Sequence, residues 1–281
     1  FAKSAKESRK RGILTFKPRH QVSKLIVEGG VVKGVAGEIL APSAVERGEQ
    51  SSRDIAGEFE FLASSVIVSS GGIGGNLELV KKNWPVERLG KPPATMIAGV
   101  PHHVDGRMIE ITKKAGGSAI NEDRMWHYTE GVRNFDPIWP SHGIRILPGP
   151  SSMWFDAEGN RFSAPCLPGF DTLETLKQIL ATGYDYSWFV LTQKIIEKEF
   201  ALSGSEQNPD LTSKKWGEVL KSRLGSGATP QVEAFKQKGE DFVVREDLKS
   251  LVDGMNQIAG GGLIQYEHLK QQIEARDREM D

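Results

Sequence analysis

Hydrophobic and polar positions change their spacing several times along the chain, and each change marks an expected element. Apolar residues gather from Leu25 to Val35 and again from Glu58 to Leu62, which predicts three strands. Glycines after Glu28 predict a tight hairpin turn between the first two of these strands. Charged residues dominate 2–11, where we predict a helix, and the apolar residues of 13–16 predict a short strand.

The chain is organised around the stretch from Phe61 to Asn76. Its apolar, β-branched run Val66–Val68 predicts a fully buried strand. Glycine fills four of the five positions 71–75, and a helix is expected over 77–83 with Asn76 as its N-cap. Glycines in such a strand-to-helix turn let the backbone approach a flat or anionic ligand, because no Cβ intervenes. The alternative is a turn that needs glycine only for its dihedral angles.

Further elements follow from local signals. Asp105-Gly106 begins a predicted helix that ends at Gly116-Gly117, and a carboxylate at such a position is usually a helix cap. Asp171 is the expected cap of the next helix. The remaining expectations are a helix over 171–183, a buried strand over 186–192, a helix over 193–202, helices with glycine breaks to 281, and a turn at 156–160 between two strand segments.

Aromatic side chains crowd between prolines in residues 121–155, where we expect neither a helix nor a regular strand. Long irregular stretches in compact domains tend to be functional or disordered, and so many aromatics argue against disorder. One interpretation is an aromatic wall that faces a ligand. The other is a connection that packs its aromatic side chains into the core. The residues concerned are Trp126, His127, Tyr128, Phe135, Trp139, His142 and Trp154.

Composition narrows the class of protein. The 281 residues suffice for one large or two ordinary domains, and a formal net charge of -1 argues against a nucleic-acid partner. No apolar run approaches the roughly 20 residues of a membrane span. The single cysteine, Cys166, excludes an internal disulfide and suits a reducing compartment, so we expect a cytoplasmic protein and a packing role for this thiol. No metal-binding motif is present, and the start at Phe1 suggests a piece of a longer polypeptide.

Several segments together resemble the flavoprotein family of fumarate reductases, succinate dehydrogenases and 3-ketosteroid dehydrogenases, in particular its bacterial FAD-binding dehydrogenases. The resemblance runs over nearly the whole chain, and the combination is much more specific than any one segment. The segments are RHQVSKLIVEGGVVKGV, VIVSSGGIGGN, VDGRMIEITKKAGG, FDAEGNRF with YSWFVLTQKIIEKEF, and FVVREDLKSLVDGM.

This resemblance implies FAD as the cofactor and an α/β fold with an α+β cap. A partial, Rossmann-like FAD-binding domain would cover 1–126, and a mixed cap domain would cover 127–281. The G-x-G-x-x-G half that grips the pyrophosphate is missing from the chain. Implied cofactor contacts are the backbone of Val22 at the adenine, then Ser69, Ser70, Gly71, Gly72, Gly74 and Asn76 along the nucleotide, and Asp105 with Gly106 near the flavin.

The implied reaction is hydride transfer at a carbon–carbon bond next to a carbonyl. Candidate catalytic residues are His127, Tyr128 and Arg145, and candidate substrate contacts are Trp126 and Trp154. Fumarate reductases place a proton-donating arginine past the G-x-R-F strand, where this chain has Gly169 or Phe170. The tyrosine that ketosteroid dehydrogenases place in this region is absent too. The aromatic residues of 126–154, without a cluster of arginines to bind carboxylates, favour an apolar, steroid-like small molecule as substrate. A homodimer is a further expectation.

Two other functions fit the same residues. The chain could be a non-catalytic fragment or interaction module that binds no flavin in isolation. It could also belong to a nicotinamide-dependent Rossmann oxidoreductase, whose G-x-G-x-x-G half would lie upstream. For His127, the alternative to acid–base chemistry is a place in the aromatic cluster with a hydrogen bond to the backbone.

Overall fold

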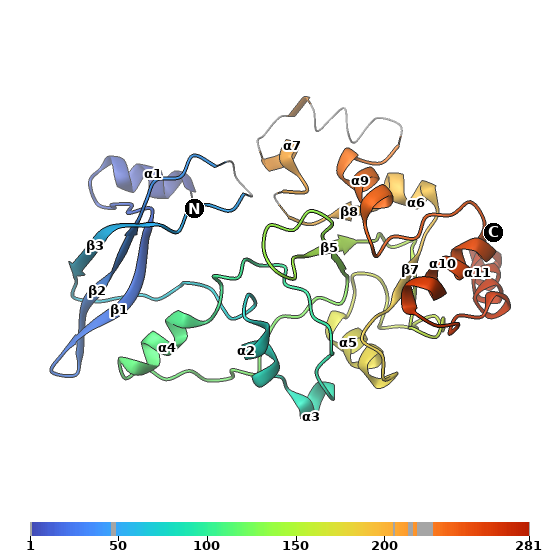
Figure 1. Ribbon diagram of the computed structural model, residues 1–281, viewed down its shortest axis with the longest axis horizontal. Coiled ribbons are helices and arrows are strands. Elements are labelled where there is room, and N and C mark those ends of the chain that lie inside the picture. The colour runs from blue at the N-terminus through green and yellow to red at the C-terminus, as the bar shows by residue number, and fades with distance from the viewer. Residues whose placement is uncertain (1, 46–48, 205, 213–215, 218–226, 281) are drawn as a thin grey trace. The chain divides into compact units, whose positions relative to one another are not determined.

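The computed structural model describes residues 2–45, 49–204, 206–212, 216–217 and 227–280 (Figure 1). The chain forms two compact units. Unit 1 combines residues 1–72 with 106–120, and unit 2 combines 73–105 with 121–281. The chain therefore leaves unit 1 after the first glycines of the central stretch and returns to it for one helix.

Unit 1 is a three-stranded antiparallel sheet with two helices, drawn mainly in blue in Figure 1. The strand order is β1-β2-β3, and α4 packs beside β1. Gly29 and Gly30 form the predicted hairpin turn with φ values of 55° and 76°. The elements are α1 (Ala2–Lys10), β1 (His20–Glu28), β2 (Val31–Leu40), β3 (Ile55–Leu62) and α4 (Arg107–Lys114).

Two strands predicted for unit 1 are wrong. Val66–Val68 pairs with no strand among the described residues, and Ile67 is 92% exposed. Residues 13–16 likewise form no strand, and Ile13 is 66% exposed. A strand needs a neighbour for its backbone groups, and β-branched composition alone does not supply one. Unit 1 accordingly has little core, since only Leu25 and Leu40 among its described hydrophobic side chains are buried.

Unit 2 contains two small antiparallel sheets, β4-β5-β8 and β6-β7, packed with helices. Four buried hydrophobic clusters lie among the described residues of this unit. Its elements among the described residues are α2 (Leu77–Lys82), α3 (Val86–Leu89), β4 (Gly131–Arg133), β5 (Gly143–Leu147), β6 (Met153–Phe155), α5 (Thr172–Ala181), β7 (Trp188–Val190), α6 (Gln193–Lys198), β8 (Ala201–Leu202), α7 (Pro209–Thr212), α9 (Pro230–Lys238), α10 (Leu248–Ala259) and α11 (Tyr266–Met280).

The structure corrects three further expectations for unit 2. The stretch 121–155 is not wholly irregular, because it supplies the paired strands β4, β5 and β6. The helix expected over 193–202 ends at Lys198, and the next residues form β8 against β5. The strand expected over 186–192 is limited to Trp188–Val190 and is only half buried. The fold is thus a mixture of helices and small antiparallel sheets, which confirms the mixed class and leaves the Rossmann-like detail unconfirmed.

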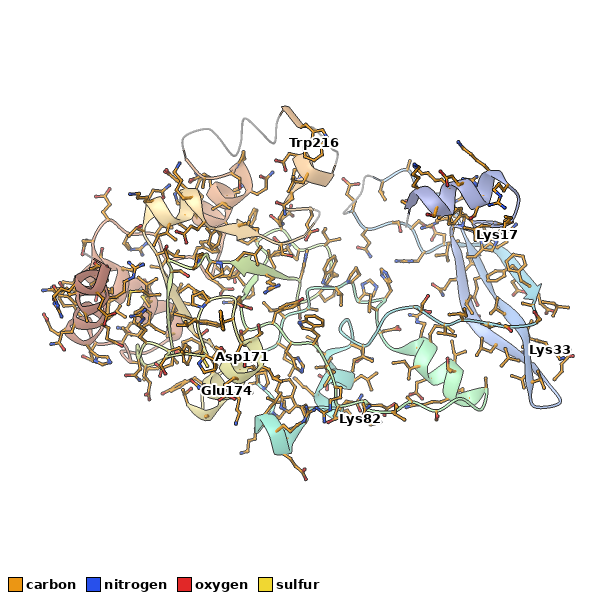
Figure 2. All side chains as sticks on the ribbon, turned by 180° about the vertical axis from the view of Figure 1, so that it is seen from behind. Lys17, Lys33, Lys82, Asp171, Glu174 and Trp216 are labelled. Carbon is orange, nitrogen blue, oxygen red and sulfur yellow. The ribbon has the colours of Figure 1, made fainter. Side chains whose placement is uncertain are left out.

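Helix caps agree closely with the sequence. The Asn76 side chain accepts a hydrogen bond from the backbone N–H of Leu79 at the start of α2. Asp171 does the same for Glu174 at the start of α5, where Figure 2 labels both residues. At α4 the N-cap is Gly106, in the left-handed region, rather than Asp105. Side-chain caps satisfy N–H groups that have no partner inside the helix, so they are readable from local sequence.

Candidate functional site

A hollow of about 320 Å³ lies at the start of α2, and we call it the α2 hollow. Its lining comes from three segments of unit 2 that are distant in sequence. Two of the predicted cofactor residues, Asn76 and Asp105, are among them. The lining residues are Gly75, Asn76, Leu77, Glu78, Ala98, His102, Asp105, Pro140 and Ser141.

Backbone contacts hold one wall of the α2 hollow. The Gly75 N–H donates to the Val104 carbonyl at 2.8 Å, and the Asn76 amide Nδ2 donates to the Asp105 carbonyl at 3.4 Å. A Cβ on Gly75 would clash with the carbonyl oxygens of Pro101 and Val104. Gly75 is therefore required by close packing of the chain on itself, which is neither the ligand cradle nor the dihedral requirement that the sequence suggested for this turn.

The first half of the glycine stretch has different surroundings in unit 1. Ser69, Ser70, Gly71 and Gly72 are exposed, and Gly71 has a φ of 90°. A Cβ on Gly72 would meet no atom within 4 Å among the described residues. The backbone here is bare, as a cradle for a flat or anionic ligand requires, so these residues fit a nucleotide cofactor.

The other predicted cofactor residues lie in regular positions. A Cβ on Gly74 would approach the Val100 side chain at 3.0 Å, so this glycine also packs against its own chain. In unit 1, Val22 is a half-buried residue of β1 opposite Gly37, next to a register shift that interrupts the ladder. Gly106 begins α4 with a φ of 83°. Contact of these residues with a cofactor stays a prediction.

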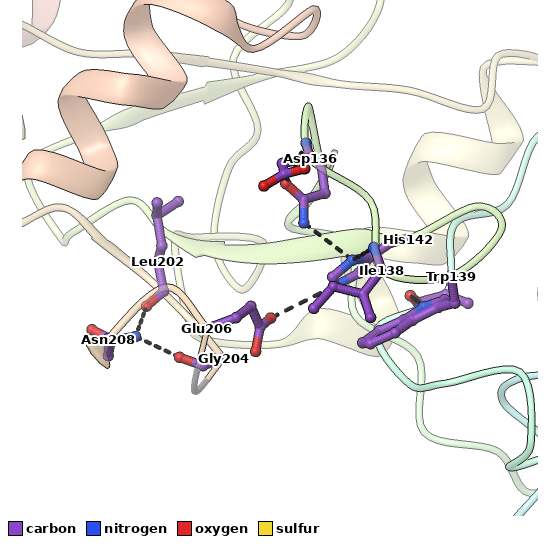
Figure 3. Close-up of polar contacts among 10 residues, drawn as sticks. Asp136, Ile138, Trp139, His142, Leu202, Gly204, Glu206 and Asn208 are labelled. Atoms are coloured by element: carbon purple, nitrogen blue, oxygen red, sulfur yellow. Dashed lines mark hydrogen bonds and ion pairs between the residues drawn. The ribbon is translucent and has the colours of Figure 1, made fainter. Parts of the chain in front are cut away.

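A buried histidine fixes the rim of the α2 hollow, and Figure 3 shows it with Trp139 on one side and Glu206 on the other. His142 is 3% exposed, and its Nδ1 accepts hydrogen bonds from the Ile138 N–H and the Asn134 side chain. Because a backbone amide can only donate, the ring proton lies on Nε2, 3.6 Å from Glu206 Oε1.

The ring of His142 stacks on Trp139 at 3.7 Å, and the Trp139 indole N–H donates to the Ala98 carbonyl at 3.0 Å. The Ala98 N–H in turn donates to the Ser141 carbonyl at 2.7 Å. Ala98 and Ser141 both line the α2 hollow, so this network holds its rim. The sequence shows His142 only as one aromatic residue among several, with no signal for this role.

Two candidate catalytic residues, Tyr128 and Arg145, come together beside a residue that sequence reasoning missed. The Arg145 guanidinium lies 4.0 Å from the centre of the Tyr128 ring. Its Nε is 3.8 Å from Oε2 of Glu130, whose side chain is only 1% exposed. Strands β4 and β5 produce this arrangement, because Gly131 pairs with Arg145 across them. We call Tyr128, Glu130 and Arg145 the Arg145 cluster.

Buried polar atoms without partners concentrate around this cluster. Seven buried side-chain nitrogen or oxygen atoms in the described residues lack a hydrogen-bond partner, and four belong to residues 127–145. Buried polar groups are normally satisfied, so such a concentration marks a place where a ligand or water is expected. The four atoms are His127 Nε2, Thr129 Oγ1, Glu130 Oε2 and Arg145 Nε.

The third candidate catalytic residue, His127, is half buried beside Trp84, with ring centres 4.7 Å apart. Burial lowers the pKa of His127 below its ordinary value, because desolvation disfavours the imidazolium. The alternative to acid–base chemistry is a hydrogen bond from this ring to the backbone. His127 Nε2 makes no such bond among the described residues. Trp126 is 84% exposed, with its ring 6.1 Å from that of Tyr128.

Trp154 and Cys166 belong to one buried cluster of unit 2. Trp154 is 2% exposed, stacks on Phe189 at 4.5 Å and donates its indole N–H to Ser187 Oγ. Cys166 is fully buried, which confirms its predicted packing role. Packing explains Trp154 fully, and substrate contact by Trp154 or Trp126 remains a prediction.

The described residues form neither a metal-binding cluster nor a membrane-spanning helix. No group of three or more histidine, cysteine, aspartate or glutamate side chains in this part of the chain is placed to hold a metal ion. Along the same residues, no helix combines the length and apolar character needed to cross a membrane.

Comparison with known proteins decides the family. A protein family described as "FAD binding domain" matches residues 2–281. The chain belongs to this FAD-binding family. Membership confirms the resemblance seen in the sequence and FAD as the cofactor that the family binds, and it favours FAD over the nicotinamide alternative.

Relatives within the family are similar over almost the whole chain. A KsdD-like steroid dehydrogenase from Mycobacterium tuberculosis is 57% identical over 275 residues, 98% of this chain and 48% of the relative. A protein of the same name from a second strain is 56% identical over the same length. One from Mycolicibacterium smegmatis is 57% identical over 265 residues, 94% of this chain and 48% of the relative. The chain thus spans about half the length of these relatives.

Proposed function

We propose that the full-length protein is an FAD-dependent dehydrogenase or reductase that acts on a carbon–carbon bond next to the carbonyl of an apolar, steroid-like molecule. One observation carries this proposal: relatives named steroid dehydrogenases are 56–57% identical over up to 98% of the chain. At such identity, residues that position a substrate are expected to be shared. FAD, when bound, supplies the hydride acceptor or donor.

We also propose how the chain is divided into domains. Residues 1–126 would contribute part of a Rossmann-like FAD-binding domain, and 127–281 would form most of the cap. The run Val66–Val68, in which Ile67 and Val68 are exposed, supports this assignment, because an apolar β-branched run is suited to a parallel sheet that is covered on both faces. The other half of that sheet would come from the part of the relatives that this chain does not span.

The chain's own residues would then do three things. Gly71 and Gly72 would bring bare backbone to the nucleotide. Arg145 would donate hydrogen bonds to the substrate carbonyl, with Tyr128 beside it. His127 would move a proton at its Nε2, since the lowered pKa of His127 keeps the ring neutral near pH 7 and able to accept one.

Anaerobic titration of the full-length protein tests the proposal. We expect a yellow protein whose flavin absorbance bleaches on addition of a saturated 3-ketosteroid and is restored by an artificial electron acceptor. Arg145→Gln should retain the flavin spectrum and bleach at least tenfold more slowly. A flavoprotein that turns over dicarboxylates but not bulky ketones would contradict the substrate class.

A second proposal concerns flavin binding by the 281-residue chain alone. We propose that these residues alone do not retain flavin, because Val66–Val68 pairs with no strand among the described residues and Ile67 is 92% exposed. The visible absorbance of the purified chain tests this directly. A colourless preparation is expected, and flavin absorbance that survives gel filtration would contradict it.

A further inference from the structure

Glu130 is buried beside the cation of the proposed substrate site. Its side chain is 1% exposed and lies 3.8 Å from Arg145 Nε, while the Arg145 side chain is 30% exposed. A buried carboxylate needs a compensating charge, and Arg145 supplies it. The two formal charges cancel, so the Arg145 cluster is close to neutral overall.

The Arg145 guanidinium keeps its hydrogen-bonding capacity. Its contacts among the described residues are the ion pair with Glu130 and the stacking on Tyr128. Neither consumes an N–H, since the ion pair is longer than a hydrogen bond and Arg145 Nε has no acceptor. A guanidinium carries five N–H donors, so a ligand oxygen at this site would find donors ready.

Charge determines which oxygen is preferred. A solitary arginine favours carboxylates, which it binds bidentately. Here an incoming carboxylate would also meet the negative charge of Glu130 across the same guanidinium, and like charges at short range disfavour it. A ketone oxygen accepts from the N–H donors without adding charge.

We propose that Glu130 determines specificity by neutralising Arg145, so that the site admits a neutral carbonyl oxygen and rejects a carboxylate. The identity of the ligand as a ketone rests on the proposed function. Glu130 acts through Arg145 and is a positioning and selecting residue rather than a catalytic one. Tyr128 adds a ring face beside the guanidinium, suited to an apolar ligand body.

Two probes of similar size, one neutral and one negatively charged, test this specificity without flavin or turnover. Acetophenone offers a ketone on an aromatic ring, and benzoate offers a carboxylate on the same ring. Binding of each to the 281-residue chain is measured by saturation-transfer NMR and calorimetry at constant ionic strength. We expect Glu130→Gln, which keeps the shape of the side chain and removes its charge, to shift the ratio of the two affinities at least tenfold towards benzoate.

A matched control is Asp241→Asn. This variant removes the same charge from beside Arg133, an arginine of β4 whose side chain is 52% exposed. Because the exposed guanidinium is solvated, the affinity ratio should stay at its wild-type value. Glu130→Gln combined with Arg145→Gln should abolish the gain in benzoate binding, since the guanidinium that would bind the carboxylate is then absent.

Each outcome decides the question. Benzoate binding that appears in Glu130→Gln supports the proposal even if the wild-type chain binds neither probe. An unchanged ratio in a variant whose circular dichroism matches wild type overturns it, and so does binding of neither probe by any variant. If Glu130→Gln does not fold, Arg145→Gln replaces it, and acetophenone binding that survives in Arg145→Gln overturns the proposal. Failure of the proposed function would appear separately, as a flavin that steroids do not reduce.

Discussion

At the scale of single residues, the two halves of one glycine stretch serve different ends. Gly75 is enclosed by the carbonyls of Pro101 and Val104, whereas Gly72 has open space where a Cβ would lie. One glycine-rich stretch therefore contains a position where close packing requires glycine and a position where glycine leaves the backbone exposed. The two positions differ only in their neighbours, because residues 101–104, which are distant in sequence, pack against Gly75.

We expect Gly75→Ala to lower the free energy of unfolding by about 2 kcal/mol or more, because backbone must move to admit the methyl group. Gly72→Ala is the matched control and should change it by less than about 1 kcal/mol. Urea denaturation followed by circular dichroism measures both. Equal effects of the two substitutions would show that the packing around Gly75 is not as described.

His127 should make stability depend on pH. Burial lowers the pKa of His127 in the folded state, so below about pH 6.5 the unfolded chain binds a proton that the folded chain does not. The stabilisation is therefore present above that pH and is lost as the pH falls towards the folded-state pKa. Between these limits, wild type should lose unfolding free energy more steeply than His127→Gln. Parallel pH profiles for the two proteins would contradict the burial of this ring.

At the scale of elements, the best-predicted features are those with local causes. The hairpin at Gly29-Gly30 and the caps at Asn76 and Asp171 depend on residues a few positions apart. The strand predicted at Val66–Val68 does not form, because a strand is completed by a partner and the described residues provide none. The β-branched composition predicts a tendency to form a strand, and pairing with a neighbouring strand decides whether the strand forms.

The cap of α5 offers a test at this scale. Asp171 accepts the N–H of Glu174 at 2.9 Å, so Asp171→Ala leaves that group without its partner and should cost about 1 kcal/mol of stability. Asp171→Asn keeps an acceptor oxygen in place and should remain close to wild type. Thermal denaturation of the two variants distinguishes them. Equal melting temperatures for Asp171→Ala and wild type would mean that the cap contributes nothing.

At the scale of the whole molecule, the two units differ in how much core they possess. The four buried hydrophobic clusters of the described part of the chain lie in unit 2, while unit 1 buries only Leu25 and Leu40 among its described hydrophobic side chains. The relatives are about twice as long as the chain. We infer that unit 1 gains its missing core from residues that the chain does not span.

Hydrogen exchange compares the chain with the full-length protein. The amides of Val66–Val68 should exchange rapidly in the chain, since they pair with nothing among the described residues. In the full-length protein they should be protected by at least a hundredfold, as in a central strand. The amides of α10, in the core of unit 2, should be protected in both proteins and serve as the internal control. Rapid exchange at Val66–Val68 in both proteins would refute the proposed sheet.

Local chemistry in the sequence was enough for the family resemblance, the hairpin and the helix caps, because each depends on side chains that are neighbours along the chain. The partnership of Glu130 with Arg145, the enclosure of Gly75 and the burial of Trp154 could not be foreseen, since residues far apart along the chain create each of them. Strand pairing and loop packing bring those residues together, and neither is encoded within a single segment.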